Sequence, residues 1–420
     1  MSLSLASLCA LSPLPIVVCS EYAQSLTLGP WPLLRSSVKS GFLALPVQLA
    51  KYCKPASGAL PISKALVVEI ARYARCIQSN AFWDELKEKE TDGAASLIEQ
   101  EVEKKVRVYD ALLRAVRAKG VLIFQGYLLD DAILRYLALA RGLKVLSVER
   151  TLRSDRLLWE SISGITVNRN QGFLHFWRRE LVTDQALADA YTESYLADVK
   201  RLKLKEHTSP AKRYQWESKK PKVLFLGQVY TDTSLLYGLK GFLNPVAVVD
   251  SLLNWAQAAD VSLVLKLHPK EHRGKNPLNG APYDDVTYKS IQARCSERIS
   301  EMGDALLIDY KNDYDTYQLI EQSDLVVTVN SQAGLEAAVM GKPVLQSRQC
   351  FYGGLGFTYE FNDPLDFSIR LDQALSGGAK NARQARMFFY LFFERFCIPH
   401  KSGSISRLMR STLRQTSTDE

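Results

Sequence analysis

The sequence predicts an α/β protein with two Rossmann-like domains, and three observations lead to this fold class. The 420 residues exceed one ordinary hydrophobic core and suit two domains of about 200 residues each. The composition, 47% hydrophobic and 23% charged, is typical of a globular chain. Short continuous apolar runs alternate with amphipathic stretches, which indicates parallel sheets with crossover helices.

The first alternating region lies between residues 94 and 149. A long amphipathic stretch predicts a helix, a short apolar run predicts a strand, and the pair then repeats. The predicted elements are a helix at 96–118, a strand at 121–125, a helix at 130–142 and a strand at 144–149.

A polar, lysine-rich stretch interrupts this pattern and predicts a linker at residues 206–221. The alternation then resumes in strands at 223–229, 261–269, 305–310, 324–330 and 343–346, with helices at 245–259, 314–322 and 331–341. We therefore expect an N-terminal domain at 1–205, a C-terminal domain at 222–380, and terminal helices at 381–420 that pack back on the N-terminal domain. The two domains are expected to face each other across a cleft.

Polar residues gather directly after the predicted strands of the second domain. Ligands of open α/β sheets bind at the carboxyl ends of strands, so these residues predict a site. The residues concerned are Thr231, Asp232, Thr233 and Ser234; His268, Pro269 and Lys270; and Asn330, Ser331 and Gln332.

The stretch after residue 330 has the features of a phosphate site. Ser331 or Asn330 can cap the following helix, and Gly334 allows close approach of the backbone. His268, between Lys266 and Lys270, adds a positive corner that can hold a departing phosphate. The alternative is structural, since capped helices and hydrogen-bonded histidines are common in any α/β protein.

Two further features fit a nucleotide. Glu336 follows on the same predicted helix, where it can meet a ribose. The loop "FYGGLGFT" at 351–358 brings Gly353 close to a ligand and offers Tyr352 for stacking. A surface glutamate favoured by the helix dipole and a plain turn are the structural alternatives.

Charge and cysteine content restrict the other possibilities. The chain carries a net +8, of which residues 380–414 supply +7 from eight basic side chains and Glu394. This basic segment, with "MFFYLFF" on its apolar side, predicts either a cover for another domain or contact with an anionic membrane surface, and no nucleic acid partner is expected.

Seven cysteines without a CxxC pair indicate free thiols in a reducing cytoplasm.

The strand-end motifs, taken together, resemble one family. "GQVYTDTSLLYG", "KLHPK", "VNSQAGLEAAVMGKPVLQ" and "CFYGGLGFT" are similar to the C-terminal half of bacterial capsule-polysaccharide β-Kdo transferases, where Kdo is 3-deoxy-D-manno-octulosonic acid. The similarity is clearest over residues 222–358. Thr233, Gly353, Leu355 and the shortened run "ERTLR" depart from the capsule enzymes, which favours an O-antigen or related enzyme.

The resemblance implies a GT-B enzyme that uses CMP-Kdo, with retention of configuration by double displacement. Asp232 is then the nucleophile, Glu160 in "LLWESISG" the acid/base, and His268 the group that holds the CMP phosphate; no metal or other cofactor is expected. The implied donor-binding residues also include Gln228, Thr231, Ser234, Lys266, Pro269 and Lys270. The implied acceptor-binding residues, from "FQGYLLDDAILRYLALARGLKVLSVERTLRS", are Gln125, Glu149, Arg150 and Arg153.

The expected partners are CMP-Kdo and a polysaccharide or lipid-linked glycan acceptor, in the bacterial cytoplasm or on the inner face of its membrane. Three alternatives stay open. Asp232 can be a structural N-cap, the enzyme can be an inverting transferase with another nucleotide sugar, or the chain can be a scaffold that docks on the membrane through its basic tail.

Overall fold

The computed structural model describes residues 14–21, 42–53, 58, 60–88, 97–166, 168, 171–179, 184–202, 212–275 and 280–414. The chain divides into two compact units. Unit 1 comprises Met1–Arg75, Asp92–Arg179 and Phe393–Glu420, and unit 2 comprises Cys76–Thr91 and Glu180–Phe392.

Unit 1 is built on a six-stranded sheet in the order β12-β5-β4-β3-β1-β2. Strands β1 to β4 are parallel, whereas β5 is antiparallel to β4, and β12 is antiparallel to β5. The bounds of the strands are β1 Ile16–Cys19, β2 Leu43–Pro46, β3 Gly120–Phe124, β4 Lys144–Arg150, β5 Arg156–Glu160 and β12 Ile398–Pro399.

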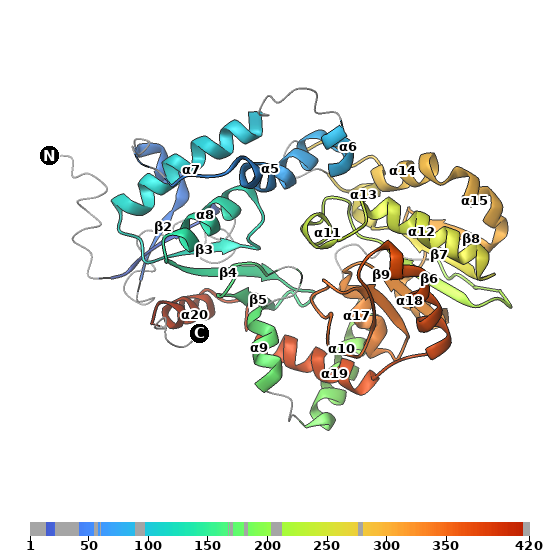
Figure 1. Cartoon of the computed structure of the whole chain (residues 1–420). Coiled ribbons are helices and arrows are strands. Elements are labelled where there is room, and N and C mark those ends of the chain that lie inside the picture. Colours follow the sequence, from blue (N-terminus) through green and yellow to red (C-terminus); the bar gives the residue numbers. More distant parts are fainter. Residues whose placement is uncertain are drawn as a thin grey trace. The chain divides into compact units, whose positions relative to one another are not determined.

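Helices cover both faces of the β1–β4 region, as Figure 1 shows with α7 and α8 on one side and α20 on the other. One core joins Val18, Val121 and Val145 to the apolar sides of η1, α5, α7 and α8, and the other joins Leu122 and Leu146 to α20. The helical segments of unit 1 are η1 Val47–Tyr52, α5 Lys64–Ser79 up to Arg75, α7 Leu97–Ala115, α8 Leu129–Ala140, α9 Gln171–Arg179 and α20 Ser402–Arg414, whereas α6 Trp83–Glu88 and α10 Gln185–Leu202 belong to unit 2.

Unit 2 contains a fully parallel sheet in the order β11-β10-β9-β6-β7-β8. Its strands are β6 Lys222–Leu226, β7 Ser262–Lys266, β8 Leu306–Asp309, β9 Leu325–Thr328, β10 Val344–Ser347 and β11 Tyr359–Phe361. The chain leaves β6 toward β7 and β8 and then crosses to β9 on the other side. The order of strands therefore reverses between β6 and β9, and such a switch point is where ligands bind in open sheets.

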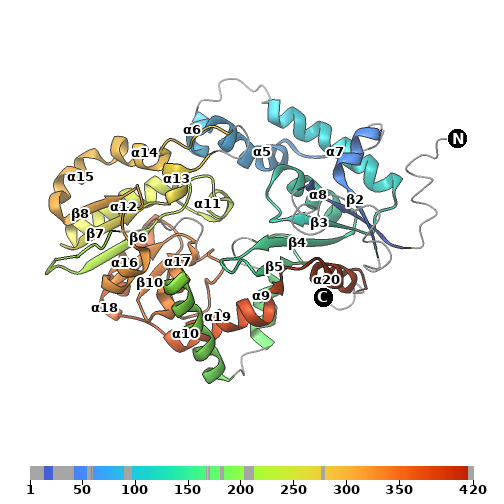
Figure 2. The same cartoon turned by 180° about the vertical axis from the view of Figure 1, so that it is seen from behind.

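Both faces of this sheet are covered by helices, which explains why its strands are continuously apolar. Figure 2 shows the helices of unit 2 from behind. A large core packs Val223, Phe225 and Leu263 against α12, α14 and α18. The helical segments are α11 Thr233–Gly238, α12 Pro245–Ala258, α13 Pro269–Arg273, α14 Val286–Arg294, α15 Ser296–Met302, η2 Gly303–Ala305, α16 Thr316–Gln322, α17 Gln332–Val339, α18 Pro364–Gly377, α19 Ala382–Tyr390 and η3 Leu391–Phe396.

The predicted fold class is confirmed as α/β with two Rossmann-like units, and the C-terminal segment from Phe393 belongs to unit 1. The unit boundaries differ from the predicted 205/222 and 380/381. Helix α10 lies in unit 2 because Tyr195 packs on Phe389 of α19. Residues 212–221 of the predicted linker also pack there, with Trp216 buried and its Nε1 donating to Ser262 Oγ at 2.8 Å; residues 206–211 lie outside the described residues.

The basic C-terminal segment has a buried apolar side. Phe388, Phe389, Phe392 and Phe393 are at most 2% exposed, and Ile405 and Met409 of α20 lie in the core of unit 1. Lys401, Arg407 and Arg414 are exposed. The covering role is therefore confirmed for the apolar side, and the basic side chains form the outer surface of α20.

Candidate functional site

Asp232 lies at the carboxyl end of β6, on the switch point of unit 2, and its carboxylate is half-buried. It caps α11: Oδ1 accepts from Ser234 N at 2.9 Å and from Ser234 Oγ at 2.8 Å. The structural alternative for Asp232 is thus observed. The cap uses only Oδ1. The other oxygen, Oδ2, accepts from Gln228 Nε2 at 3.1 Å.

Gln228 connects this turn to the end of β9. Its Nε2 donates to Asp232 Oδ2 and, at 3.0 Å, to Ser234 Oγ, while its Oε1 accepts from Asn330 N at 2.8 Å. Asn330 Oδ1 accepts in turn from Phe351 N at 3.2 Å. One hydrogen-bonded chain therefore spans the switch point and brings together the residues that the sequence placed after β6 and β9.

His268 follows β7 and caps α13, with Pro269 as the first helical residue. Its Nδ1 accepts from Lys270 N at 3.2 Å. This bond requires an unprotonated Nδ1, so the proton of the neutral imidazole is on Nε2, which makes Nε2 a hydrogen-bond donor. The half-buried ring is therefore suited to donate to an anion.

The start of α17 is capped by Ser331, one of the two caps that the sequence predicts. Ser331 caps the helix by accepting from Ala333 N at 3.2 Å, and Asn330 is largely buried before it. Gly334 is required by packing, because a Cβ there would lie 2.3 Å from Tyr352 Oη and 2.8 Å from Thr328 Cγ2. Gln332 is exposed at the first turn.

Tyr352 is buried in the protein, so its ring is not accessible for the stacking on a ligand that the sequence predicted. The side chain is 0% exposed, and its hydroxyl donates to Ser331 O at 2.9 Å. Burial raises its pKa well above the usual range. Gly353 is likewise buried, and a Cβ there would lie 2.5 Å from Arg348 O. The loop thus packs against the start of α17 through Tyr352.

Lys266 is also placed differently from the prediction. It is 4% exposed, and its Nζ donates at 2.7 Å to Asp309 Oδ2, Asn312 Oδ1 and Tyr314 O. All three N–H donors are used, and burial lowers the pKa of the ammonium. Lys266 therefore joins β7 to the end of β8. Lys270 is half-buried, with Nζ 5.8 Å from the Tyr283 ring centroid.

Glu336 is fully buried, so the predicted ribose contact is not available in this structure. Its Oε1 accepts from Tyr195 Oη at 2.9 Å and from Tyr317 Oη at 2.5 Å. The carboxylate therefore ties α17 to α10 and α16. Burial, followed by the charge of Glu336, raises the pKa of Tyr317.

The sequence argument missed Glu271, which directly follows "HPK". This buried carboxylate accepts from Tyr230 N at 2.9 Å, Thr287 N at 2.9 Å and Thr287 Oγ1 at 2.8 Å, and burial raises its pKa. It fixes the turn that carries Thr231 and Asp232; Thr231 and Ser234 are themselves buried. The signal was an acidic residue beside the motif on an otherwise basic stretch.

In unit 1, a second polar cluster lies at the carboxyl ends of β3 and β4. Glu149 is half-buried and accepts from Gln125 Nε2 at 2.9 Å and Thr166 Oγ1 at 2.7 Å. Gln125 has a left-handed backbone, with φ of 62°, which is uncommon for a residue other than glycine. Two predicted acceptor residues are thus brought together. Arg150 is exposed, and Arg153 pairs with Asp155 at 3.1 Å.

Glu160 is bound to its own loop. It is 0% exposed and accepts from the backbone N–H groups of Ile162, Ser163 and Gly164 at 2.6–2.7 Å, from Ile165 N at 3.3 Å, and from Ser163 Oγ at 2.7 Å. These bonds shape the turn after β5. The predicted acid/base role is therefore not supported by its geometry, and Glu149 is the more accessible carboxylate.

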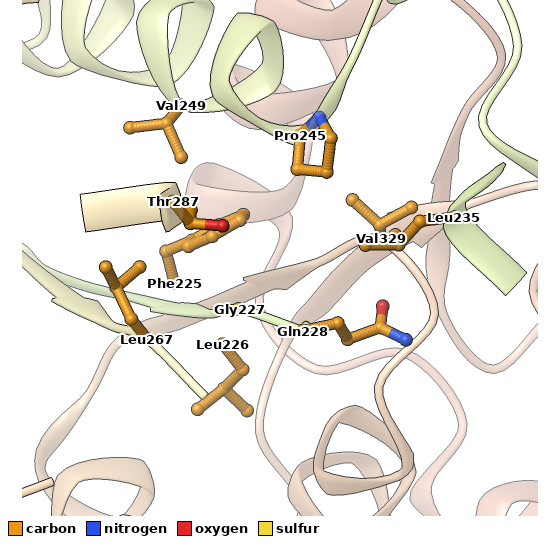
Figure 3. A pocket seen from close by; sticks show the side chains of 10 residues that line it. All are labelled: Phe225, Leu226, Gly227, Gln228, Leu235, Pro245, Val249, Leu267, Thr287 and Val329. Carbon is orange, nitrogen blue, oxygen red and sulfur yellow. The ribbon is translucent and has the colours of Figure 1, made fainter. Parts of the chain in front are cut away.

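A small pocket lies beside Gln228 in unit 2. Figure 3 shows Gln228 extending from β6 among mostly apolar lining side chains. Thr287 supplies the other polar side chain. The described residues contain no group of three or more His, Cys, Asp or Glu side chains placed to hold a metal ion, and none of the helices described is long and apolar enough to cross a membrane.

Residues 183–365 match the model of the family described as "Capsule polysaccharide biosynthesis protein". The matched range contains all of residues 222–358, on which the resemblance found in the sequence is clearest. The match confirms that resemblance for this part of the chain. No curated protein sequence matches the chain.

Solved structures with a similar arrangement include two of KpsC from Thermosulfurimonas dismutans. The one described as a β-Kdo 2,4 transferase is 16% identical with a TM-score of 0.46, and covers 70% of this chain and 87% of its own. The one described as a β-Kdo 2,7 transferase is 15% identical with a TM-score of 0.40, and the match covers 83% of this chain and 97% of that structure. UDP-GlcNAc 2-epimerase from Neisseria meningitidis is 13% identical with a TM-score of 0.32, and covers 95% and 98%.

Proposed function

We propose that this chain is a retaining glycosyltransferase that moves Kdo from CMP-Kdo to a saccharide acceptor of a bacterial surface polysaccharide. The observation that carries the proposal is the switch point of unit 2. There a half-buried carboxylate, Asp232, is hydrogen-bonded through Gln228 to the loop that begins α17. The family match supports a role in capsule polysaccharide biosynthesis, and the sequence resemblance suggests the class of reaction and the donor.

In this proposal Asp232 attacks the anomeric carbon of Kdo, and the bond from that carbon to the CMP phosphate breaks. The backbone N–H groups at the start of α17 and the Nε2–H of His268 donate to the phosphate as its charge develops. Lys266 is excluded from this role because its three donors are already used. These donors need no metal, and we propose a metal-independent reaction.

The acceptor hydroxyl then attacks the same carbon, releases Asp232 and gives its proton to a base. We propose Glu149 rather than Glu160 for that role, because Glu149 is half-exposed and accepts from the side chains of Gln125 and Thr166. General base catalysis of this kind contributes roughly 10²–10⁴ in rate. Gln125 and Thr166 would hold the carboxylate, and Arg150 would face the glycan.

We also propose that the enzyme works in the cytoplasm at the inner membrane, through the basic outer side of α20. Its apolar side is buried in unit 1, so this contact would be electrostatic and sensitive to salt. Co-sedimentation with anionic vesicles, lost with zwitterionic vesicles or high salt, is the expected result. Equal binding to both vesicle types would contradict it.

The deciding experiment is a transfer assay with CMP-Kdo and with UDP- and GDP-sugars, in which nucleotide release is measured and the product is analysed by NMR. We expect CMP release with CMP-Kdo and a β-linked product. An inverted product would indicate an inverting transferase with Asp232 as base. Absence of nucleotide release with every donor and glycan acceptor would indicate a scaffold.

A further inference from the structure

We propose that Gln228 is a positioning residue that orients the Asp232 carboxylate relative to the start of α17. This inference rests on the proposed function for its kinetic part and on geometry alone for its structural part. The sequence placed Gln228 among the residues that bind the donor. Its hydrogen bonds instead run between two parts of the protein.

The orientation of the Gln228 amide is fixed by its partners. Asn330 N–H can only donate, so it requires Oε1, and Asp232 Oδ2 can only accept, so it requires Nε2. A flipped amide would place Oε1 against Asp232 Oδ2 and the Nε2–H group against the N–H of Asn330. The two contacts, one after β6 and one after β9, therefore select one orientation of the amide.

Gln228 completes the support of the carboxylate. Ser234 holds Oδ1 through its backbone N–H and its hydroxyl, whereas Gln228 holds Oδ2. With both oxygens bound, the plane of the carboxylate is set. Asn330 directly precedes the Ser331 cap, so the same amide also fixes the distance from Asp232 to α17.

This arrangement matters because nucleophile and leaving phosphate must lie on opposite sides of the anomeric carbon. A displacement of about 1 Å in such a geometry can reduce rate by on the order of 10²-fold. Loss of the amide should therefore reduce kcat strongly. Affinity for CMP should change little, because the amide contacts neither proposed phosphate-binding group, α17 backbone N–H or His268.

The test compares Gln228→Glu, the double variant Gln228→Glu/Asp232→Asn, and Gln257→Glu as a control at an exposed position of α12. In Gln228→Glu two carboxylates meet where the amide–carboxylate distance is now 3.1 Å. We expect a fall in Tm of roughly 2–8 °C. In the double variant the donor and acceptor are exchanged, so Tm should recover while transfer stays absent.

For kinetics, we expect Gln228→Glu to lose on the order of 10²-fold in kcat, with the Kd for CMP, measured by calorimetry, kept within about 3-fold. The control should match the parent in all measurements. A large loss of CMP affinity with kcat retained would show direct donor contact and overturn the proposal. Additive Tm changes in the double variant would also overturn it.

The two kinds of failure are distinguishable. If the parent transfers no sugar from any nucleotide donor, the proposed function fails. The Tm cycle still decides whether Gln228 and Asp232 are coupled, because it needs neither donor nor acceptor.

Discussion

Asp232 and Glu160 both lie at the end of a strand, yet their carboxylates are held in opposite ways. Glu160 is 0% exposed and is bound by four backbone N–H groups and the Ser163 hydroxyl. Asp232 is half-exposed and receives one backbone N–H, one hydroxyl and one amide. A carboxylate bound by backbone donors in a buried turn has a structural role, whereas a carboxylate with accessible oxygens can still contact a substrate.

The same contrast separates other charged residues. Glu149 resembles Asp232, since its donors are the side chains of Gln125 and Thr166 and it is half-exposed. Lys266 resembles Glu160, because every donor of its buried ammonium has a partner in the protein. The contrast therefore sorts the predicted residues into those available to a substrate and those that maintain the structure.

The largest effect is expected at Asp232. Asp232→Asn keeps the size and the Ser234 contact but removes the nucleophilic oxygen, so transfer should fall by at least about 10³-fold while CMP binding is retained. Intact-protein mass spectrometry of the parent with CMP-Kdo should show a glycosyl adduct that the variant lacks.

Asp260→Asn is the matched control, since Asp260 is exposed and paired with Lys220 in the same unit. It should retain full activity. Normal turnover of Asp232→Asn would remove the nucleophile role and with it the main difference from Glu160.

Lys266→Met tests the buried side of the contrast. Removing one partner of a buried pair leaves the Asp309 carboxylate without its cation, which should cost about 3 kcal/mol of unfolding free energy. Urea unfolding measures this loss, and Lys220→Met, at an exposed pair, should change stability by less than about 1 kcal/mol. A stable Lys266→Met protein with weakened CMP binding would instead support the original phosphate role.

Periodicity was sufficient to predict most of the central strands and helices, because runs such as 223–229 and 324–330 are apolar on both faces. It did not predict β1, β2, β5, β11 or β12. Of these, β2, β11 and β12 lie at the edges of their sheets, and β12 pairs with a segment far away in sequence, as Ile398 does with Leu157. Sequence spacing carries no signal for such contacts.

The residues of the candidate site could be found from the sequence, but the sequence did not show which of them are accessible to a ligand and which are buried. Strand ends identified Asp232, His268 and Ser331, since topology alone brings them to one edge. Burial decided against Lys266, Glu336 and Tyr352, and that burial comes from partners such as Asn312 and Tyr195, which lie tens to more than a hundred residues away. Residue type indicated chemistry; tertiary packing determined access.

Glu149→Gln and Glu160→Gln separate catalysis from support in unit 1. Glu149→Gln should lower kcat by about 10²-fold with little change in Tm, because an amide can replace part of the hydrogen bonding but not accept the proton. Glu160→Gln should instead lower Tm, because an amide cannot accept all the bonds of the turn. Measuring kcat and Tm for both variants checks this. The reverse pattern would restore Glu160 as the acid/base.

Asp131 extends the comparison to a buried carboxylate with few donors. It accepts from Phe124 N at 2.9 Å and from the Ser20 side chain, and burial outweighs these bonds, raising its pKa to about 7. The unfolded value is about 3.9. The folded state therefore binds the proton more tightly, so this stability is present below pH 4 and is lost as pH rises through about 7.

Asp131→Asn should remove this dependence, since the amide stays neutral and can still accept from Phe124 N. The unfolding free energy of the parent minus that of the variant should be about 2 kcal/mol larger at pH 5.5 than at pH 8. Urea unfolding at the two pH values measures it. A difference independent of pH would show that the two hydrogen bonds are enough to stabilise the charged form of Asp131. The number of donors would then not distinguish Asp131 from Glu160.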